Sequence, residues 1–202
     1  MLQITSAQIE QALEALIAGK VIVYPTETSY ALGCDATNDS AVRRIFEIKG
    51  RPGGKGLPVI IGLESEAETY LELSETAQQL AKMFWPGSLN IIVPIVYGSK
   101  ISSACSQYGT QSIRVSSHPF ASTLASRLGK PIVATSANIS GQDAIYTVRD
   151  VQKIFKGHTE PDLVIDAGEL PAVPASTTIK VLGEEVTIIR QGSTIIPGEF
   201  LQ

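Results

Sequence analysis

Apolar side chains recur every three or four positions in five segments of the chain. In the first segment Leu13 and Ile17 fall on one face, and Gly19 stands where a helix would stop. Before the last segment, Thr147 and Asp150 have the spacing of a capping box. These signals are typical of amphipathic helices with defined ends. The pattern predicts helices over residues 6–18, 74–84, 119–128 and 148–155, and a further helix that is capped by Asp39 or Ser40 and ends at Lys49.

Short apolar runs bounded by proline, glycine or polar residues mark the candidate strands. Residues 21–24 form such a run, ended by Pro25, which is typical of a strand buried on both faces. The pattern predicts strands over residues 21–24, 57–61, 89–96, 112–115, 132–134, 163–165, 177–181 and 186–189, with loops over 25–34 and 98–109. Strands alternating with helices indicate an α/β fold, so we expect one domain over residues 1–202, with a twisted mixed β-sheet flanked by helices.

The composition supports a folded globular protein and narrows its function classes. Of the 202 residues, 44% are hydrophobic and 18% are charged, which favours a sizeable core over a disordered chain. The net charge of −4 argues against a surface that binds nucleic acid or anionic lipid as a whole. Cys34 and Cys105 provide neither a disulfide framework nor a zinc ribbon. No signal-peptide pattern or membrane-length apolar run occurs, so we expect a cytoplasmic protein with no membrane partner.

Positive charge is concentrated between residues 43 and 55, where five basic residues accompany one acid. Arg43 and Arg44 have the positions of a solvated helix face. Lys49, Arg51 and Lys55 instead lie at and beyond the predicted helix end, among glycines that let backbone and cations approach a ligand. This segment therefore predicts either a phosphate or carboxylate site or an exposed flexible loop.

Common nucleotide, metal and hydrolase motifs do not occur in the sequence. Gly54 and Lys55 are not part of a P-loop, because Lys49 stands where that motif needs glycine and Gly56 where it needs Ser or Thr. The sequence also has no Gly-x-Gly-x-x-Gly after a strand, no His-Glu-x-x-His and no Gly-x-Ser-x-Gly. We therefore expect no metal held by the protein itself and no covalent hydrolytic mechanism.

Two polar segments, residues 24–28 and 134–141, follow predicted buried strands. Ligands of α/β proteins gather at strand ends, where hydroxyl and amide groups can bind phosphate, ribose or amino-acid groups. Taken singly, each segment is better explained by ordinary turn and cap chemistry.

Seven segments, taken together, make a more specific pattern. They read YPTETSYALGCD (24–35), KGRPGGKGL (49–57), WPGSL (85–89), IRV (113–115), PIVATSANISG (131–141), ASTT (175–178) and IRQG (189–192). In this order, and over nearly the whole chain, they resemble the YrdC family, in particular its short single-domain bacterial form. The resemblance implies a concave α/β sheet around a basic pocket.

The resemblance also implies an activity. Such proteins condense L-threonine, bicarbonate and ATP into threonylcarbamoyl-AMP and pyrophosphate, with Mg²⁺ accompanying the nucleotide. The product then feeds N6-threonylcarbamoyladenosine formation at position 37 of tRNA through downstream transfer proteins, and a weak contact with tRNA itself is a further expectation.

Individual residues acquire expected roles from this resemblance. Threonine would be held by Thr28, Arg114, Ser136 and Ser176, and the nucleotide by Arg51, Lys55, Thr110, Asn138, Tyr146 and Arg190. Lys49 and Arg51 would act catalytically by stabilising charge at the reacting phosphate. This assignment fits elementary chemistry, because joining a carbamate to a triphosphate is opposed mainly by charge repulsion, which cations relieve without a protein nucleophile.

The sequence departs from the family pattern at several positions. Ala31 stands where glycine is usual, Asn90 where threonine is common, Ser116 and Ser117 where Pro-Asp is frequent, and Ile60 where longer members often carry histidine. These departures bear on substrate preference more than on the nucleotide step. Two other functions stay open at this point: a module that binds tRNA or double-stranded RNA, and a nucleotide-sensing paralogue without this activity.

Overall fold

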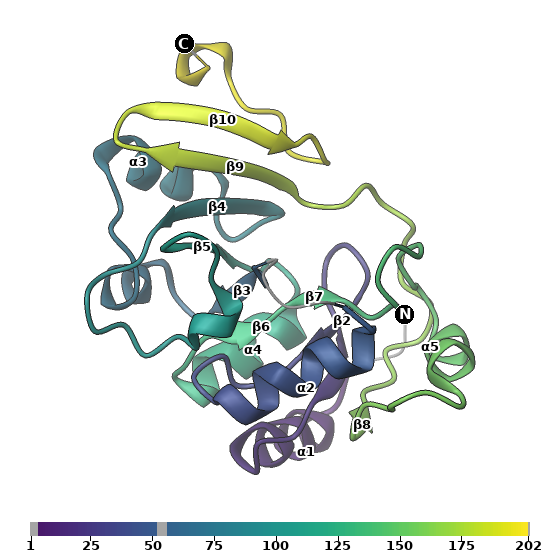
Figure 1. Ribbon diagram of the computed structural model, residues 1–202. Coiled ribbons are helices and arrows are strands. Elements are labelled where there is room, and N and C mark those ends of the chain that lie inside the picture. Colours follow the sequence, from purple (N-terminus) through teal and green to yellow (C-terminus); the bar gives the residue numbers. More distant parts are fainter. Residues whose placement is uncertain (1–3, 52–55, 202) are drawn as a thin grey trace.

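The computed structural model describes residues 4–51 and 56–201, and its helices begin and end at local signals (Figure 1). The Thr5 side chain accepts a hydrogen bond from the Gln8 amide at the start of the first helix. Gly50 and Gly129 end two others in the left-handed conformation that favours glycine. The helices are α1 (Ser6–Ile17), α2 (Asp39–Lys49), α3 (Glu75–Phe84), α4 (Pro119–Leu128) and α5 (Val148–Phe155), with short 3-10 helices at Glu64–Thr69, Ser103–Cys105 and Gly198–Phe200.

Two of the predicted helix starts need correction. The cap of α2 is Asn38, one residue earlier than predicted, and its side chain accepts hydrogen bonds from the next helical amides. At α5, the Thr147 hydroxyl oxygen accepts from the Asp150 amide as predicted. The Asp150 carboxylate, however, accepts from the Thr147 hydroxyl at 2.6 Å. In a complete capping box the Asp150 side chain would accept from the Thr147 backbone amide. That hydrogen bond is missing among the contacts of this turn.

The strands form two sheets instead of the single sheet that the sequence predicted. The smaller sheet has the order β7 (Thr135–Ser136), β2 (Tyr30–Gly33), β1 (Ile22–Pro25) and β8 (Leu163–Val164). The larger has the order β10 (Glu185–Arg190), β9 (Thr177–Leu182), β4 (Leu89–Pro94), β5 (Thr110–Val115), β3 (Val59–Ile61) and β6 (Ile132–Val133). Both contain parallel and antiparallel pairs, so the predicted mixed α/β fold is confirmed.

The two sheets meet along residues 132–136, which pass from the larger sheet directly into the smaller one. The Val133 amide donates to the Cys34 carbonyl at 2.9 Å, and the Ala134 amide donates to the Pro58 carbonyl at 2.8 Å. A further isolated bridge joins Asp35 to Ile132. This crossing holds β2 and β3, which belong to different sheets, at a fixed separation.

Strand β2 lies inside the segment predicted as a loop. Polar residues 26–29 made this segment look like a long loop, but they form only a tight connection, in which the Thr26 amide donates to the Ser29 carbonyl. The residues after it are fully or nearly fully buried and pair antiparallel with β1. Burial against a neighbouring strand, which no local pattern encodes, therefore decides this element.

Two apolar clusters stabilise the fold, and α1 and α4 cover one of them. In this cluster Tyr24, Ile60 and Phe120 are each at most 1% exposed, and the rings of Tyr24 and Phe120 lie 6.5 Å apart. The other cluster packs α2, α3 and α5 against residues of both sheets. Figure 1 shows α1, α2 and α4 together at the end of the molecule opposite β9 and β10. No described helix, within residues 4–51 and 56–201, has the length and apolar character needed to cross a membrane.

Replacing Gly33 by alanine tests the junction between the sheets. A Cβ at Gly33 would lie 2.3 Å from the Val133 carbonyl oxygen and 2.6 Å from the Tyr24 ring, and the backbone atom cannot move aside. We expect Gly33→Ala to lower the free energy of unfolding by about 1 to 3 kcal/mol. Urea titration followed by fluorescence of the buried Trp85 measures it. Gly198→Ala, where a Cβ meets open space, is the control and should change it by less than about 0.5 kcal/mol.

Candidate functional site

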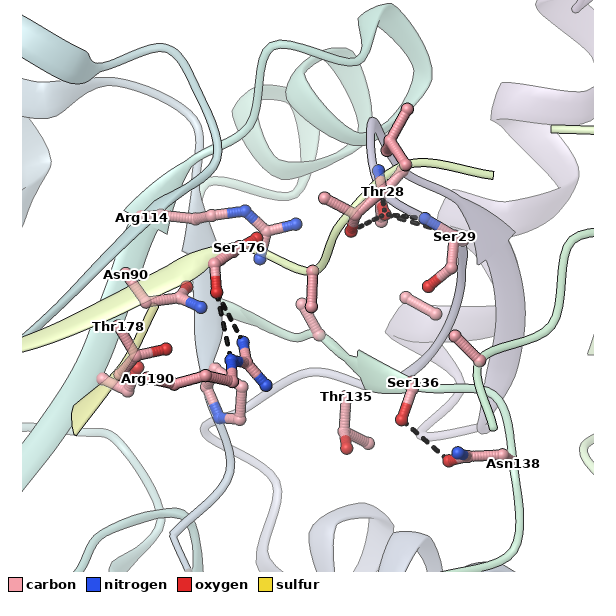
Figure 2. Close-up of a pocket in the computed structure, with 18 of the residues that line it drawn as sticks. Thr28, Ser29, Asn90, Arg114, Thr135, Ser136, Asn138, Ser176, Thr178 and Arg190 are labelled. Carbon is pink, nitrogen blue, oxygen red and sulfur yellow. Dashed lines mark hydrogen bonds between the residues drawn. The ribbon is translucent and has the colours of Figure 1, made fainter. Parts of the chain in front are cut away.

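A cavity of about 640 Å³ opens between the two sheets. Its wall takes Ala31 and Ser136 from the smaller sheet, and Asn90, Arg114 and Arg190 from the larger one. Figure 2 shows the side chains of Ser136, Arg114 and Arg190 around a shared space. The polar residues that line the cavity include Thr26, Thr28, Ser29, Arg51, Asn90, Ser112, Arg114, Thr135, Ser136, Asn138, Asp143, Tyr146, Ser176, Thr178 and Arg190.

Three arginines from distant parts of the chain, Arg51, Arg114 and Arg190, line this cavity. The Arg190 Nε and Nη2 atoms donate to the Ser176 carbonyl oxygen at 3.1 and 2.8 Å. Arg51 has one long contact, from Nη2 to the Gly56 carbonyl oxygen at 3.5 Å, and its Nε is buried without a partner among the described residues. The protein therefore leaves donor capacity on these guanidinium groups for a ligand.

Arg114 is held by a carboxylate, Glu27, that itself has further support. The Arg114 Nε donates to Glu27 Oε1 at 2.9 Å, and the two side chains are only 4% and 14% exposed. The Ser116 hydroxyl donates to the second Glu27 oxygen and accepts from the His118 amide at 3.2 Å. Ser116, one of the departures from the family pattern, thus contacts the partner of a cavity arginine and keeps the Arg114 guanidinium in one orientation.

The cavity is a positively charged, partly buried environment. Burial is the main cause that lowers the pKa of Arg190, and the charge of Arg114 is the second cause. Burial also lowers the pKa of Arg51. Both shifts reflect an energetic cost of enclosing cations, and an anion placed between them would offset it. Guanidinium groups of this kind suit carboxylate, carbonate or phosphate groups.

Lys49 does not line the cavity, contrary to the direct phosphate contact that the sequence suggested. Its ammonium group is buried beneath the turn after β7 and donates to the Ser136 carbonyl at 2.5 Å and to both the carbonyl and side-chain oxygens of Asn138 at 2.9 Å. Two causes lower the pKa of Lys49 to about 8: burial is the larger, and the charge of Arg51 is the smaller. The helix end that carries Lys49 is packed against this turn, so the lysine fixes the two polar residues that do face the cavity.

Most of the other predicted residues gather at the cavity. The cavity is lined by all four residues that were predicted to bind threonine, namely Thr28, Arg114, Ser136 and Ser176. It is also lined by four residues that were predicted to bind the nucleotide, namely Arg51, Asn138, Tyr146 and Arg190. Thr110 is not among the lining residues, because its hydroxyl donates to the Gln107 carbonyl at 2.8 Å in a tight turn before β5. Lys55 lies outside the residues that the structure describes.

Several lining residues escaped the sequence reasoning. Thr178 was not predicted as a site residue, and Asn90 was named only as a departure from the family pattern, although the alternation of β4 and β9 places both on the face of Arg114 and Arg190. Thr26 was noted only as part of a polar segment. Its hydroxyl donates to the Ser29 carbonyl at 2.7 Å and shapes the loop that presents Thr28. Period-two alternation was the one signal that could have identified Asn90 and Thr178.

Within residues 4–51 and 56–201, histidine, cysteine and carboxylate groups do not gather in sets of three or more that would hold a metal ion. Asp143 is the acidic residue that lines the cavity.

Comparison with known proteins places the chain in a family. Residues 14–192 match the Sua5/YciO/YrdC family model, which is described as telomere recombination. The chain belongs to this family. Among relatives, the threonylcarbamoyl-AMP synthase of Vibrio vulnificus (strain YJ016) is 39% identical over 150 residues, which cover 72% of this chain and 80% of that protein.

Solved structures of family members share the fold. P. abyssi Sua5 complexed with L-threonine superposes with a TM-score of 0.87 at 33% identity, over 94% of this chain and 55% of Sua5. The chain therefore spans little more than half of Sua5. E. coli YciO gives a TM-score of 0.83 at 28% identity, over 95% of this chain and 92% of YciO. The two-sheet architecture is thus common to members of this family with different lengths.

The ion pair between Arg114 and Glu27 leads to a prediction of how the stability of the protein depends on pH. Burial alone would raise the pKa of Glu27, but Arg114 and the Ser116 hydroxyl lower it below its usual value of 4.5. The contribution of Glu27 to stability is therefore present above the pKa of the unfolded chain and lost as the pH falls through the lower folded value. We expect Glu27→Gln to lower the free energy of unfolding by about 1 to 3 kcal/mol at neutral pH. In acid, the free energies of unfolding of the variant and of the parent protein should converge.

Chemical denaturation at a series of pH values measures this difference. The control is Glu10→Gln, which removes an ion pair with Arg127 that is exposed to solvent. Exposed pairs contribute little, so this variant should stay close to the parent protein at every pH. A Glu27→Gln difference that did not shrink in acid would contradict the assignment of the effect to the ion pair.

Proposed function

We propose that this protein is an L-threonylcarbamoyladenylate synthase. The observation that carries the proposal is the convergence of Arg51, Arg114 and Arg190 on one cavity, in a chain whose family includes threonylcarbamoyl-AMP synthases. The substrates are L-threonine, bicarbonate and ATP, and the products are threonylcarbamoyl-AMP, pyrophosphate and water. The adenylate then serves tRNA modification at position 37 through separate transfer proteins.

The amino acid occupies the end of the cavity formed by Thr28, Arg114, Ser136 and Ser176. Arg114 can hold the α-carboxylate, because the bond from its Nε to Glu27 leaves its terminal N–H groups toward the cavity (Figure 2). The hydroxyl groups of the other three residues offer hydrogen bonds to the ammonium and hydroxyl groups of threonine. One methyl group distinguishes threonine from serine and contributes only about 1 to 3 kcal/mol to that selectivity.

The nucleotide occupies the end with Arg51, Asn138, Tyr146 and Arg190, to which the proposal adds Lys55. The guanidinium groups of Arg51 and Arg190 stabilise the phosphates, and their unused donors face this part of the cavity. Mg²⁺ arrives with ATP, where it neutralises phosphate charge. A magnesium ion is usually bound through one or two carboxylates plus substrate phosphates, and Asp143 is the residue of the wall with that chemistry.

The reaction needs positioning and charge stabilisation rather than a protein nucleophile. The threonine amine attacks the bicarbonate carbon, a C–N bond forms, and water leaves. A carbamate oxygen then attacks the α-phosphorus, and the bond to the β-phosphate oxygen breaks as pyrophosphate departs. Each step brings negative groups together, so fixed cations lower the barrier. Arg51 acts on the phosphates directly, whereas Lys49 is a positioning residue that acts through the turn carrying Ser136 and Asn138.

Omission of each substrate tests the proposal. The full mixture should release pyrophosphate and form a product with the mass of threonylcarbamoyl-AMP. Omitting threonine, bicarbonate or ATP should abolish both signals. Stabilisation by ATP without threonine-dependent turnover would indicate a nucleotide sensor instead. RNA affinity that falls steeply with salt, together with no pyrophosphate release, would indicate an RNA-binding module.

Arg51→Ala tests the electrostatic mechanism. We expect the variant to lose activity about 100-fold to 1,000-fold, because one fixed donor to the charged transition state is removed. Arg43→Ala is a matched control on α2, since its guanidinium is 69% exposed and makes only a surface pair with Asp39. The control should stay within about twofold of the parent rate, measured as pyrophosphate release. An unchanged rate for Arg51→Ala would remove Arg51 from this role.

A further inference from the structure

Two tyrosines at one end of the larger sheet leave their rings in solvent. Tyr97 and Tyr108 are 104% and 94% exposed, whereas every other aromatic side chain in residues 4–51 and 56–201 is buried or partly buried. The segments that carry them run side by side beyond the ends of β4 and β5, where the Ile95 amide donates to the Gly109 carbonyl at 3.0 Å. Exposed aromatic rings are enriched at protein interfaces, because they bury a large area at a low entropic cost.

Tyr108 occupies a backbone conformation that its side chain disfavours. The backbones of Gln107 and Thr110 exchange two hydrogen bonds, of 3.0 and 2.9 Å, so Tyr108 and Gly109 form a two-residue turn. Their φ angles are 51° and 72°, the signs that a type I′ turn requires. Asparagine or glycine usually occupies the first of these positions, since a bulky side chain at positive φ is strained. Burial within the single chain does not offset this strain, so the ring at this position points to a function outside it.

A groove of about 400 Å³ lies directly beside the Tyr108 ring. Ile95, Val96 and Ile101 supply its aliphatic side chains, and the rest of the lining is serine, glycine and Tyr108 itself. Lys100 is exposed and is not among the lining residues. The described wall of the groove therefore lacks the cations that a nucleic-acid backbone needs, and it suits an uncharged aromatic side chain instead.

The projecting ring and the groove that would accept it lie on the same face of the molecule. In a two-fold interface each copy presents the same patch, so a contact made by one copy is repeated by the other. The chain has a net charge of −4, so two copies repel each other unless they meet at a neutral surface. The uncharged groove is such a surface, because the centres of interfaces are depleted in charge.

We propose that Tyr97, Tyr108 and the groove between residues 95 and 109, together called the tyrosine face, form an interface between two copies of this chain. The Tyr108 ring of each copy enters the groove of the other, and Tyr97 covers the rim. Serine hydroxyls of the groove offer hydrogen bonds to the entering phenol group. The inference is independent of the proposed function, because the groove shares no lining residue with the cavity between the sheets.

Sedimentation velocity of the full chain tests the interface. A single patch of this size gives a weak contact, so we expect a dimer with a Kd of about 10 to 100 µM. The protein is measured at fixed ionic strength over a concentration series from about 1 to 500 µM, which brackets that Kd. The weight-average mass should rise from one chain of 21.5 kDa toward two chains.

Two variants locate the contact, and a third is the control. Tyr108→Asn removes the ring but keeps a residue that the turn favours, so it should weaken the Kd at least about 10-fold without lowering the Tm of the monomer. Ser103→Arg adds a charge at an exposed position of the groove wall and should weaken the Kd at least about 10-fold as well. Ile17→Gln removes an apolar side chain on α1 that is 70% exposed, outside the tyrosine face, and should leave the Kd within about twofold.

Several outcomes would overturn the interface. The parent protein could stay monomeric at the highest concentration, or its dimer could be unaffected by Tyr108→Asn or by Ser103→Arg. A dimer abolished by Ile17→Gln would place the contact elsewhere and also exclude the tyrosine face. If the parent protein stayed monomeric and instead bound total tRNA in a manner lost in Tyr108→Asn, the tyrosine face would be an RNA contact and the proposal would fail.

Discussion

Like charges enclosed in one cavity are the constraint on which the rest of this structure depends. Arg51, Arg114 and Arg190 come from segments far apart in the chain and line the same space. Burial disfavours the charged forms of Arg51 and Arg190, and the charge of Arg114 adds to the cost at Arg190. The fold offsets part of this cost with fixed acceptors, chiefly the Glu27 carboxylate and the Ser176 carbonyl. An anionic ligand would offset more, so stability and ligand binding depend on the same charges.

The split into two sheets creates the space in which these charges meet. Residues 132–136 belong first to one sheet and then to the other, and their hydrogen bonds to Cys34 and Pro58 join the two sheets. The buried Lys49 ammonium donates to oxygen atoms of Ser136, at the end of β7, and of Asn138, in the turn after it. This arrangement explains why a lysine next to the cavity can be important without pointing into it. Its hydrogen bonds add to others that hold the same turn, such as that from the Ala137 amide to the Tyr30 carbonyl.

Four of the departures from the family pattern lie at the cavity wall or behind it. Ala31 and Asn90 line the cavity, Ser116 contacts the carboxylate behind Arg114, and Ile60 is fully buried beside Arg114 in the sheet. Ala31 pairs with Ser136 in the smaller sheet and Asn90 with Thr178 in the larger one, so the departures lie on both sides of the cavity.

Local signals in the sequence determined most helices and many strands. Helix spacing, Gly50 and Gly129 specified α2 and α4, and continuous apolar runs specified β1 and β6, because these features act over a few residues. The resemblance of ordered motifs also identified the residues of the cavity, including Arg114 and Arg190. Local patterns do not indicate which strands pair with each other. For this reason β2 was predicted as a loop, and one sheet was predicted where the structure has two.

Only the tertiary structure decided what each polar group contacts. It showed that Lys49 bonds to the turn after β7, that Thr110 is used within its own turn, and that Arg114 is held by Glu27. These relations depend on strand register and on separations of tens of residues along the chain. The sequence by itself determined which chemical groups were available, and long-range packing determined which of them remained free to bind a ligand.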